Sequence, residues 1–239
     1  MRRRRRDAGL VRLGERDLFA LRIVGEQYAV RLSLLADILA VFDGSPVSAD
    51  AARKVASRWH RGRLAEVAPI LAGQGSHAWL THYGLEQVGL PYRPWVPTAV
   101  GLPHADAVTA VRIGLEALPE GRWISERSLR QGLSRTAGST MPHLPDGELL
   151  GAFGRTAIEV ELTAKTIERT RKILAGLASR RGGYGSDDQV AREGYRYAQV
   201  RYFAADEALS VVRQARERLP EDLSARVRVE PLSALRWPR

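Results

Sequence analysis

The chain has 239 residues, 44% of them hydrophobic, and a formal net charge of +10, which is enough apolar material for one large or two small domains. It contains no cysteine and five histidines without close ligand spacing, which excludes disulfides and thiolate metal sites and argues against a structural zinc. No apolar run could span a bilayer and no signal peptide is recognisable, so we expect a cytoplasmic protein without a membrane partner. The basic excess points to a polyanion, first of all double-stranded DNA, although an arginine-favouring GC-rich genome would also raise this charge.

The N-terminal part begins with a charged arm and two predicted helices. Residues 2–6 are five consecutive arginines that cannot be buried, so residues 1–14 are expected to form a flexible arm that is either solvated or in contact with DNA. Apolar residues at three- to four-residue spacing predict one helix over residues 18–28 and a second over residues 32–42. The DGSP turn at 43–46 ends the second helix.

A third helix carries a basic stripe. Ser48 is its predicted N-cap, and apolar residues at positions 52, 55, 56 and 59 face inward. The outward stripe provides the candidate DNA-binding residues, which are Arg53, Lys54, Ser57, Arg58 and Arg61. Residues 67–71 and 77–81 flank AGQGS and predict a β-hairpin, followed by a return to helix in THYGLEQVGL.

Three helices and a hairpin predict a winged helix-turn-helix over residues 15–90. In that fold the third helix would enter the major groove and the hairpin would lie along the backbone. A solvated face of any basic protein would show the same stripe, and a winged helix can also bind protein.

Four prolines in residues 91–103 predict a linker, and residues 104–239 form the second predicted domain. This domain is expected to be α/β with a mixed central sheet, which makes the whole chain α+β. Its predicted elements are a helix at 105–118, strands at 122–125 and within 143–162, a helix at 163–180 capped by Thr163, a strand at 199–204, a helix at 206–219 and a strand at 227–232, with loops at 134–140 and 180–188.

Carboxylates are concentrated in residues 143–165, HLPDGELLGAFGRTAIEVELTAK. Because strand side chains alternate, Glu159 and Glu161 are expected on one face, with the intervening apolar residues facing the core. The two glutamates either line the solvent side of a half-buried strand or belong to a site. If the two strands form a hairpin, Asp146 approaches both glutamates, and a cation such as Mg²⁺ or Mn²⁺ would relieve the repulsion.

PDGEL followed by AIEVELTAK resembles the PD-(D/E)xK, or restriction-endonuclease-like, nuclease superfamily, with Asp146 in the PD element and Glu159 as the following acid. The resemblance implies a nuclease in which Asp146, Glu159 and Glu161 hold Mg²⁺ or Mn²⁺. Glu161 departs from the pattern because the superfamily usually has lysine there, although some restriction enzymes have glutamate. Lys165, expected one turn into the next helix, is the candidate replacement for that charge.

Two further groups of residues are candidates with simpler alternatives. Glu126 follows a predicted strand and either joins the acidic site or is an exposed acid in the first turn of a helix. His104 and His143 are predicted to be structural or surface histidines rather than general bases.

Over its whole length, the chain resembles the replication-relaxation family of plasmid and mobile-element proteins. The segments that carry the resemblance are LTHYGLEQVGL, LPHADAVTAVRIGL, RWISERSLR, HLPDGEL, AIEVELTAKTIERTRKIL and QVRYFA, in this order. It implies a DNA endonuclease or nickase in plasmid replication, relaxation or transfer, with other replication or transfer proteins, or a second copy, as partners. The alternative is a non-catalytic replication or transcription regulator with a degenerate nuclease fold.

Overall fold

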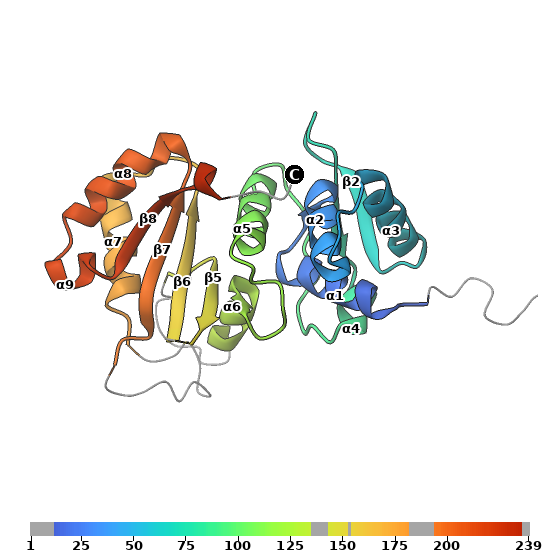
Figure 1. Cartoon of the computed structure of the whole chain (residues 1–239), viewed down its shortest axis with the longest axis horizontal. Helices are drawn as coiled ribbons and strands as arrows, with labels where there is room; N and C mark the ends of the chain where they lie inside the picture. Colours follow the sequence, from blue (N-terminus) through green and yellow to red (C-terminus); the bar gives the residue numbers. More distant parts are fainter. Residues whose placement is uncertain (1–11, 135–142, 153, 182–193, 236–239) are drawn as a thin grey trace, which may run out of the picture. The chain divides into compact units, whose positions relative to one another are not determined.

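The computed structural model describes residues 12–134, 143–152, 154–181 and 194–235. The chain divides into two units, Met1–Thr109 and Ala110–Arg239, which are described separately (Figure 1). Most of the predicted arm, and most of the predicted loops at 134–140 and 180–188, lie outside the described residues.

The first unit combines helices with a small antiparallel sheet. Strand β3 lies between β1 and β2 and is antiparallel to both. The elements are α1 (Glu15–Glu26), β1 (Val30–Arg31), α2 (Leu32–Asp43), α3 (Ala49–Arg61), β2 (Ala65–Pro69), β3 (Ser76–Leu80), α4 (His82–Gln87) and the start of α5 (Leu102–Gly114). The three predicted helices, the hairpin and the helix after it are therefore confirmed. Strand β1 was not predicted, because two residues are too few to show the alternation of a strand.

Helix α3 forms where its cap and apolar spacing predict it. The Ser48 hydroxyl accepts a hydrogen bond from the Ala51 amide at 3.1 Å, and Trp59 is fully buried. Asp17 of α1 accepts a 2.8 Å hydrogen bond from the Trp59 indole and pairs with Arg58. These contacts fix the inner face of α3 against α1, so the opposite face is the one presented to solvent.

Buried polar contacts join the start of α5 to the small sheet. Asp106 accepts a 3.3 Å hydrogen bond from the Arg31 amide, and its second oxygen lies 3.0 Å from Nε2 of His77, which is fully buried. These contacts bind residue 106 to the first unit. They give a physical reason why the division between the units falls within α5, whereas the sequence placed the linker at residues 91–103.

The second unit contains a five-stranded mixed sheet in the order β4-β5-β6-β7-β8. The neighbours β4, β5 and β6 are antiparallel, whereas β6, β7 and β8 are parallel. After the end of α5 come β4 (Trp123–Ser125), α6 (Glu126–Ser134), β5 (Gly147–Gly151), β6 (Gly154–Glu161), α7 (Ile167–Ala178), β7 (Tyr197–Ala204), α8 (Asp206–Glu217), α9 (Glu221–Ser224), β8 (Val227–Pro231) and a 3₁₀ turn, Leu232–Ala234. The α+β class with a mixed sheet is confirmed.

Both faces of β6 are buried, which corrects the expectation that its glutamates lie opposite the core. Ala157, on the same face as Glu159 and Glu161, joins the apolar cluster formed by β7, α7 and α8. Figure 1 shows α7 and α8 on one side of this sheet. Ile158 and Val160 face the other side and are also buried. The strand therefore carries two acids on a face that is covered by helices.

The start of α7 differs from the prediction. Its N-cap is Thr166, whose hydroxyl accepts from the Arg169 amide at 3.3 Å, and the helix begins at Ile167. Thr163 is therefore not the cap, and Lys165 lies in the connection before the helix instead of one turn into it. The sequence TAKT offers two threonines as caps, and local pattern does not choose between them.

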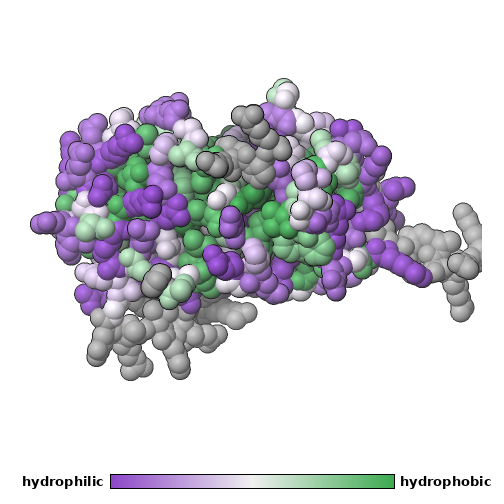
Figure 2. All heavy atoms as spheres, in the orientation of Figure 1, coloured by the Kyte–Doolittle hydropathy of each residue, from purple (hydrophilic) through white to green (hydrophobic). Residues whose placement is uncertain are grey.

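Hydrophilic side chains dominate the outer surfaces of α3 and α8 in the view of Figure 2. Among the described residues, large hydrophobic side chains are exposed at a few positions, including Val41 and Phe42 at the end of α2. In the described part of the chain, no helix combines the length and the apolar character that a bilayer crossing requires.

Candidate active site

The β5–β6 hairpin places Asp146 beside the C-terminal end of β6. Asp146 immediately precedes β5, and its Oδ2 accepts a 2.7 Å hydrogen bond from the backbone amide of Val160. The next residue is glycine for a steric reason, since a Cβ on Gly147 would lie 2.0 Å from the ring of Trp123 on β4. Tight packing of β4 on β5 therefore fixes the point at which Asp146 enters the sheet.

Glu159 is the most unusual side chain of this hairpin. It is 4% exposed, and its Oε1 lies 2.9 Å from Nε2 of His143. Its Oε2 is buried and has no hydrogen-bond partner within the described part of the chain. Burial of a carboxylate without full hydrogen bonding is unfavourable, so this side chain requires a physical explanation.

The surroundings of Glu159 change its acidity. Burial, assisted by the charge of Asp146, raises the pKa of Glu159 to about 7, while His143 and Lys165 oppose the rise. Burial lowers the pKa of His143, but its hydrogen bond to Glu159 and the charges of Glu159 and Asp146 outweigh this effect and raise it. The pKa values of Glu159 and His143 are therefore both raised, and each group contributes to the shift of the other.

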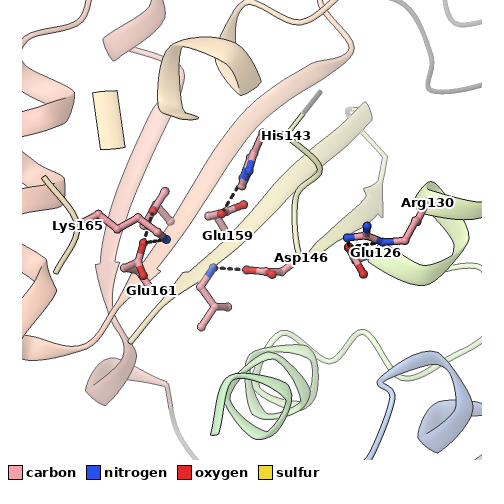
Figure 3. Close-up of polar contacts among 9 residues, drawn as sticks. Glu126, Arg130, His143, Asp146, Glu159, Glu161 and Lys165 are labelled. Atoms are coloured by element: carbon pink, nitrogen blue, oxygen red, sulfur yellow. Dashed lines mark hydrogen bonds and ion pairs between the residues drawn. The ribbon is translucent and has the colours of Figure 1, made fainter. Parts of the chain in front are cut away.

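Glu161 lies two residues further along the same face. Its Oε2 pairs with the ammonium of Lys165 and also accepts a 3.1 Å hydrogen bond from the hydroxyl of Tyr202 on β7. Tyr202 is fully buried, and burial together with the charges of Glu159 and Glu161 raises the pKa of its phenol. Figure 3 shows the His143 ring over Glu159 and the Lys165 side chain reaching Glu161.

The predicted site residues are only partly brought together. Asp146 and Lys165 both lie close enough to Glu159 for their charges to change its pKa: Asp146 raises it and Lys165 lowers it. Glu126 lies in the first turn of α6 and pairs with Arg130 one helical turn later, as Figure 3 also shows. Glu126 is not among the charges that affect the pKa of Glu159, but its side chain is only 17% exposed, so it is not the exposed acid of the alternative either.

A second buried carboxylate has a different role. Glu148 on β5 is fully buried and accepts hydrogen bonds from Arg196 through Nε at 2.8 Å and Nη2 at 3.1 Å. Arg155 Nη1 and the Tyr197 hydroxyl each donate to it at 2.8 Å. This set fills the acceptor positions of the carboxylate and links β5, β6 and the start of β7.

The candidate DNA-binding residues of α3 are not equivalent. Arg53, Lys54, Ser57 and Arg61 are exposed, and Arg53 and Lys54 pair with the exposed Asp50 at 3.3 and 2.8 Å. Arg58 is partly buried and is engaged with Asp17. A substitution at Arg58 would therefore affect the packing of α3 as well as any contact with a ligand.

Sequence reasoning missed two members of the acidic site. His143 was expected to be structural or at the surface, yet its ring contacts the buried carboxylate of Glu159. Tyr202 was not among the predicted site residues, although its hydroxyl and the Lys165 ammonium bind the same oxygen of Glu161. The position of His143, three residues before Asp146, could have indicated that it lies near the acids. Tyr202 reaches Glu161 through the register of β7 on β6, which no local sequence pattern indicates.

Within the described ranges, no three His, Asp or Glu side chains form a group that is ready to hold a metal ion. Comparison with known proteins finds no matching family model, no match among curated proteins and no match among solved structures.

Proposed function

We propose that the chain is a DNA-binding protein whose second unit cleaves phosphodiester bonds with the help of a divalent cation, as an endonuclease or nickase. The observation that carries the proposal is Glu159, a buried carboxylate with a raised pKa and an unfilled oxygen beside Asp146. The resemblance to PD-(D/E)xK nucleases and to plasmid replication-relaxation proteins, which rests on sequence motifs, supports the same reading. A role in plasmid replication, relaxation or transfer is part of the proposal.

One feature of these residues suits a hard cation such as Mg²⁺ or Mn²⁺: Oε2 of Glu159 has no hydrogen-bond donor among the described residues and could bind the ion. Asp146 and Glu159 would hold the ion, which when bound supplies Lewis-acid stabilisation of the phosphate and activation of water. The ammonium of Lys165 adds a positive charge near these carboxylates, where it can stabilise charge on a phosphate. Nε2 of His143 lies 2.9 Å from Oε1 of Glu159 and would orient the carboxylate.

The first unit supports the DNA-binding half of the proposal. Three helices and an antiparallel hairpin follow the order of a winged helix, with α3 as the recognition helix. The exposed face of α3 carries Arg53, Lys54 and Arg61 against a single acid, Asp50. Such a stripe gains affinity for phosphates by releasing counterions.

The cleavage test uses supercoiled plasmid and the full chain. We expect nicked or linear products with Mg²⁺ or Mn²⁺ and none in EDTA. Asp146→Asn should reduce the rate by roughly 100-fold, because loss of a metal-holding carboxylate removes several kcal/mol of transition-state stabilisation. Glu168→Gln is the matched control, since Glu168 is exposed on α7 and pairs with Arg171 and Lys172 of its own helix. Equal cleavage by the Asp146→Asn variant would contradict the proposal.

The DNA-binding test compares two sets of charge removals. Replacing Arg53, Lys54 and Arg61 by alanine should weaken duplex binding and reduce the salt slope by about 0.9 for each lost phosphate contact. Replacing Lys172, Arg213 and Arg218, which are exposed on or beside α7 and α8, removes the same charge elsewhere. If both triple variants lose the same affinity in a fluorescence anisotropy titration, only bulk charge matters and α3 is not the recognition helix.

A second candidate function is a DNA-binding regulator whose nuclease-like unit is not catalytic. Two observations favour it: Glu161 is occupied by Lys165 and Tyr202, and Asp146 is bonded to the Val160 amide. This reading predicts sequence-selective DNA binding through α3 with no hydrolysis under any divalent metal.

A further inference from the structure

Glu161 stands at the position where the resemblance led us to expect a metal ligand, but its contacts indicate a different role. The side chain is 5% exposed, and one oxygen receives both the Lys165 ammonium and the Tyr202 hydroxyl. A carboxylate oxygen with two donors is well satisfied, unlike Oε2 of Glu159. The charge of the buried Glu161 carboxylate is therefore compensated by the Lys165 ammonium.

Lys165 is held at a defined place by this pair. It lies in the connection between β6 and α7, where no helix orients its long side chain. Its side chain is only 25% exposed, and its charge is felt by both Glu159 and His143. Without an anchor, a lysine with four rotatable bonds would move freely and its ammonium would remain in water.

We propose that Glu161 is a positioning residue that, together with Tyr202, fixes the ammonium of Lys165 beside Glu159, and that Glu161 does not bind the metal. The anchor chain runs from β7 through Tyr202 to Glu161 on β6 and from there to Lys165. The catalytic use of the fixed ammonium rests on the proposed function, whereas the anchoring itself does not.

The anchoring is tested without any measurement of activity. The chain has three lysines, Lys54, Lys165 and Lys172, so the side-chain ammonium signals in a ¹H–¹⁵N NMR spectrum are few and can be assigned by single Lys→Arg variants. Lys54 and Lys172 are 79% and 73% exposed and should exchange fast with water. We expect a slowly exchanging Lys165 signal that broadens or is lost in the Glu161→Gln variant and shifts in Tyr202→Phe. An unchanged Lys165 signal in Glu161→Gln would overturn the proposal, whether or not the protein cleaves DNA.

The second arm separates positioning from metal binding. Titration of the full chain with Mn²⁺ alone should give the same affinity for Glu161→Gln as for the wild type, whereas Asp146→Asn and Glu159→Gln should lose affinity. Plasmid cleavage by Glu161→Gln should fall by about 10- to 100-fold, because misplacement of a catalytic group by about an ångström has this cost. A loss of Mn²⁺ affinity in Glu161→Gln comparable to that of Asp146→Asn would show that Glu161 is a ligand and would overturn the proposal.

A charge exchange supplies the rescue experiment. The double variant Glu161→Lys with Lys165→Glu keeps an ion pair of reversed order, and its ammonium lies on the same face of β6 as Glu159. It should cleave faster than Lys165→Glu alone, because the positive charge is restored near Glu159. Additive losses in the double variant would argue that the two residues act independently and against anchoring.

Discussion

The Glu159→Gln variant should be more stable than the wild type above neutral pH and yet lose metal-dependent cleavage. The carboxylate is buried, its pKa is raised from 4.5 to about 7, and one of its oxygens has no partner among the described residues. A neutral amide of the same shape avoids the cost of a buried charge, which at 1.36 kcal/mol per pKa unit is on the order of 3 kcal/mol for this shift. Under the proposed function, activity should fall by roughly 100-fold or more, because a neutral amide would hold the cation less well than the carboxylate does.

The pH dependence of this stability difference has a definite sign. Because the pKa of Glu159 is higher in the folded state, protonation of Glu159 favours folding, and this contribution is fully present below its unfolded value of 4.5. It is lost as pH rises through about 7. The pKa of His143 is also raised, so its contribution is present below its ordinary value of 6.5 and is lost as pH rises further. The stabilisation by Glu159→Gln should therefore be largest near pH 8 and small near pH 5.

The measurement is urea unfolding at both pH values, with hydrogen exchange of the β5–β7 amides to report on the second unit alone. Glu168→Gln, exposed on α7, is the matched control for removing one negative charge. If Glu159→Gln destabilises the second unit at pH 8, Glu159 is a structural acid, and the main support for a catalytic site is removed.

Truncation of Glu148 should have the opposite effect on stability. Glu148→Ala removes the acceptor of Arg196, Arg155 and Tyr197, and Arg196 is 3% exposed. Removing one partner of a buried ion pair leaves an uncompensated charge and typically costs about 3–5 kcal/mol. We expect the second unit to unfold at much lower urea concentration, with loss of exchange protection first at the start of β7.

Two comparisons make this result specific. Glu148→Gln keeps the shape and part of the hydrogen bonding, so its loss should be smaller than that of alanine. Glu168→Ala breaks an exposed ion pair with Arg171 and should leave the free energy of unfolding nearly unchanged. A Glu148→Ala protein as stable as the Glu168→Ala protein would show that the buried network contributes little.

Local chemistry predicted most elements of the fold. The Ser48 cap, the apolar spacing of α3 and the AGQGS turn, in which Gly73 and Gly75 have φ values of 74° and 76°, are properties of short segments. The predicted hairpin is also confirmed, and its pairing explains why Asp146 lies beside the strand that carries Glu159.

The rest depended on contacts distant in sequence. Glu148 meets Arg196 across 48 positions, and Tyr202 meets Glu161 across 41. The alternation of β6 indicated that Glu159 and Glu161 share a face, but it did not reveal that both faces are buried. The burial of the acidic face depends on how α7 and α8 pack against the sheet, which the sequence of β6 alone does not indicate.

The hairpin of β5 and β6 carries two buried glutamates that can be compared directly, Glu148 and Glu159. Glu148 and Glu159 project from the same face of the same sheet. Four donors bind Glu148, whereas one oxygen of Glu159 has no donor among the residues that the structure describes. Two equally buried acids on one face of a sheet can therefore differ widely in how many hydrogen-bond donors serve them. That number marks Glu148 as a residue that joins strands, and it is the reason why we place the proposed ligand at Glu159.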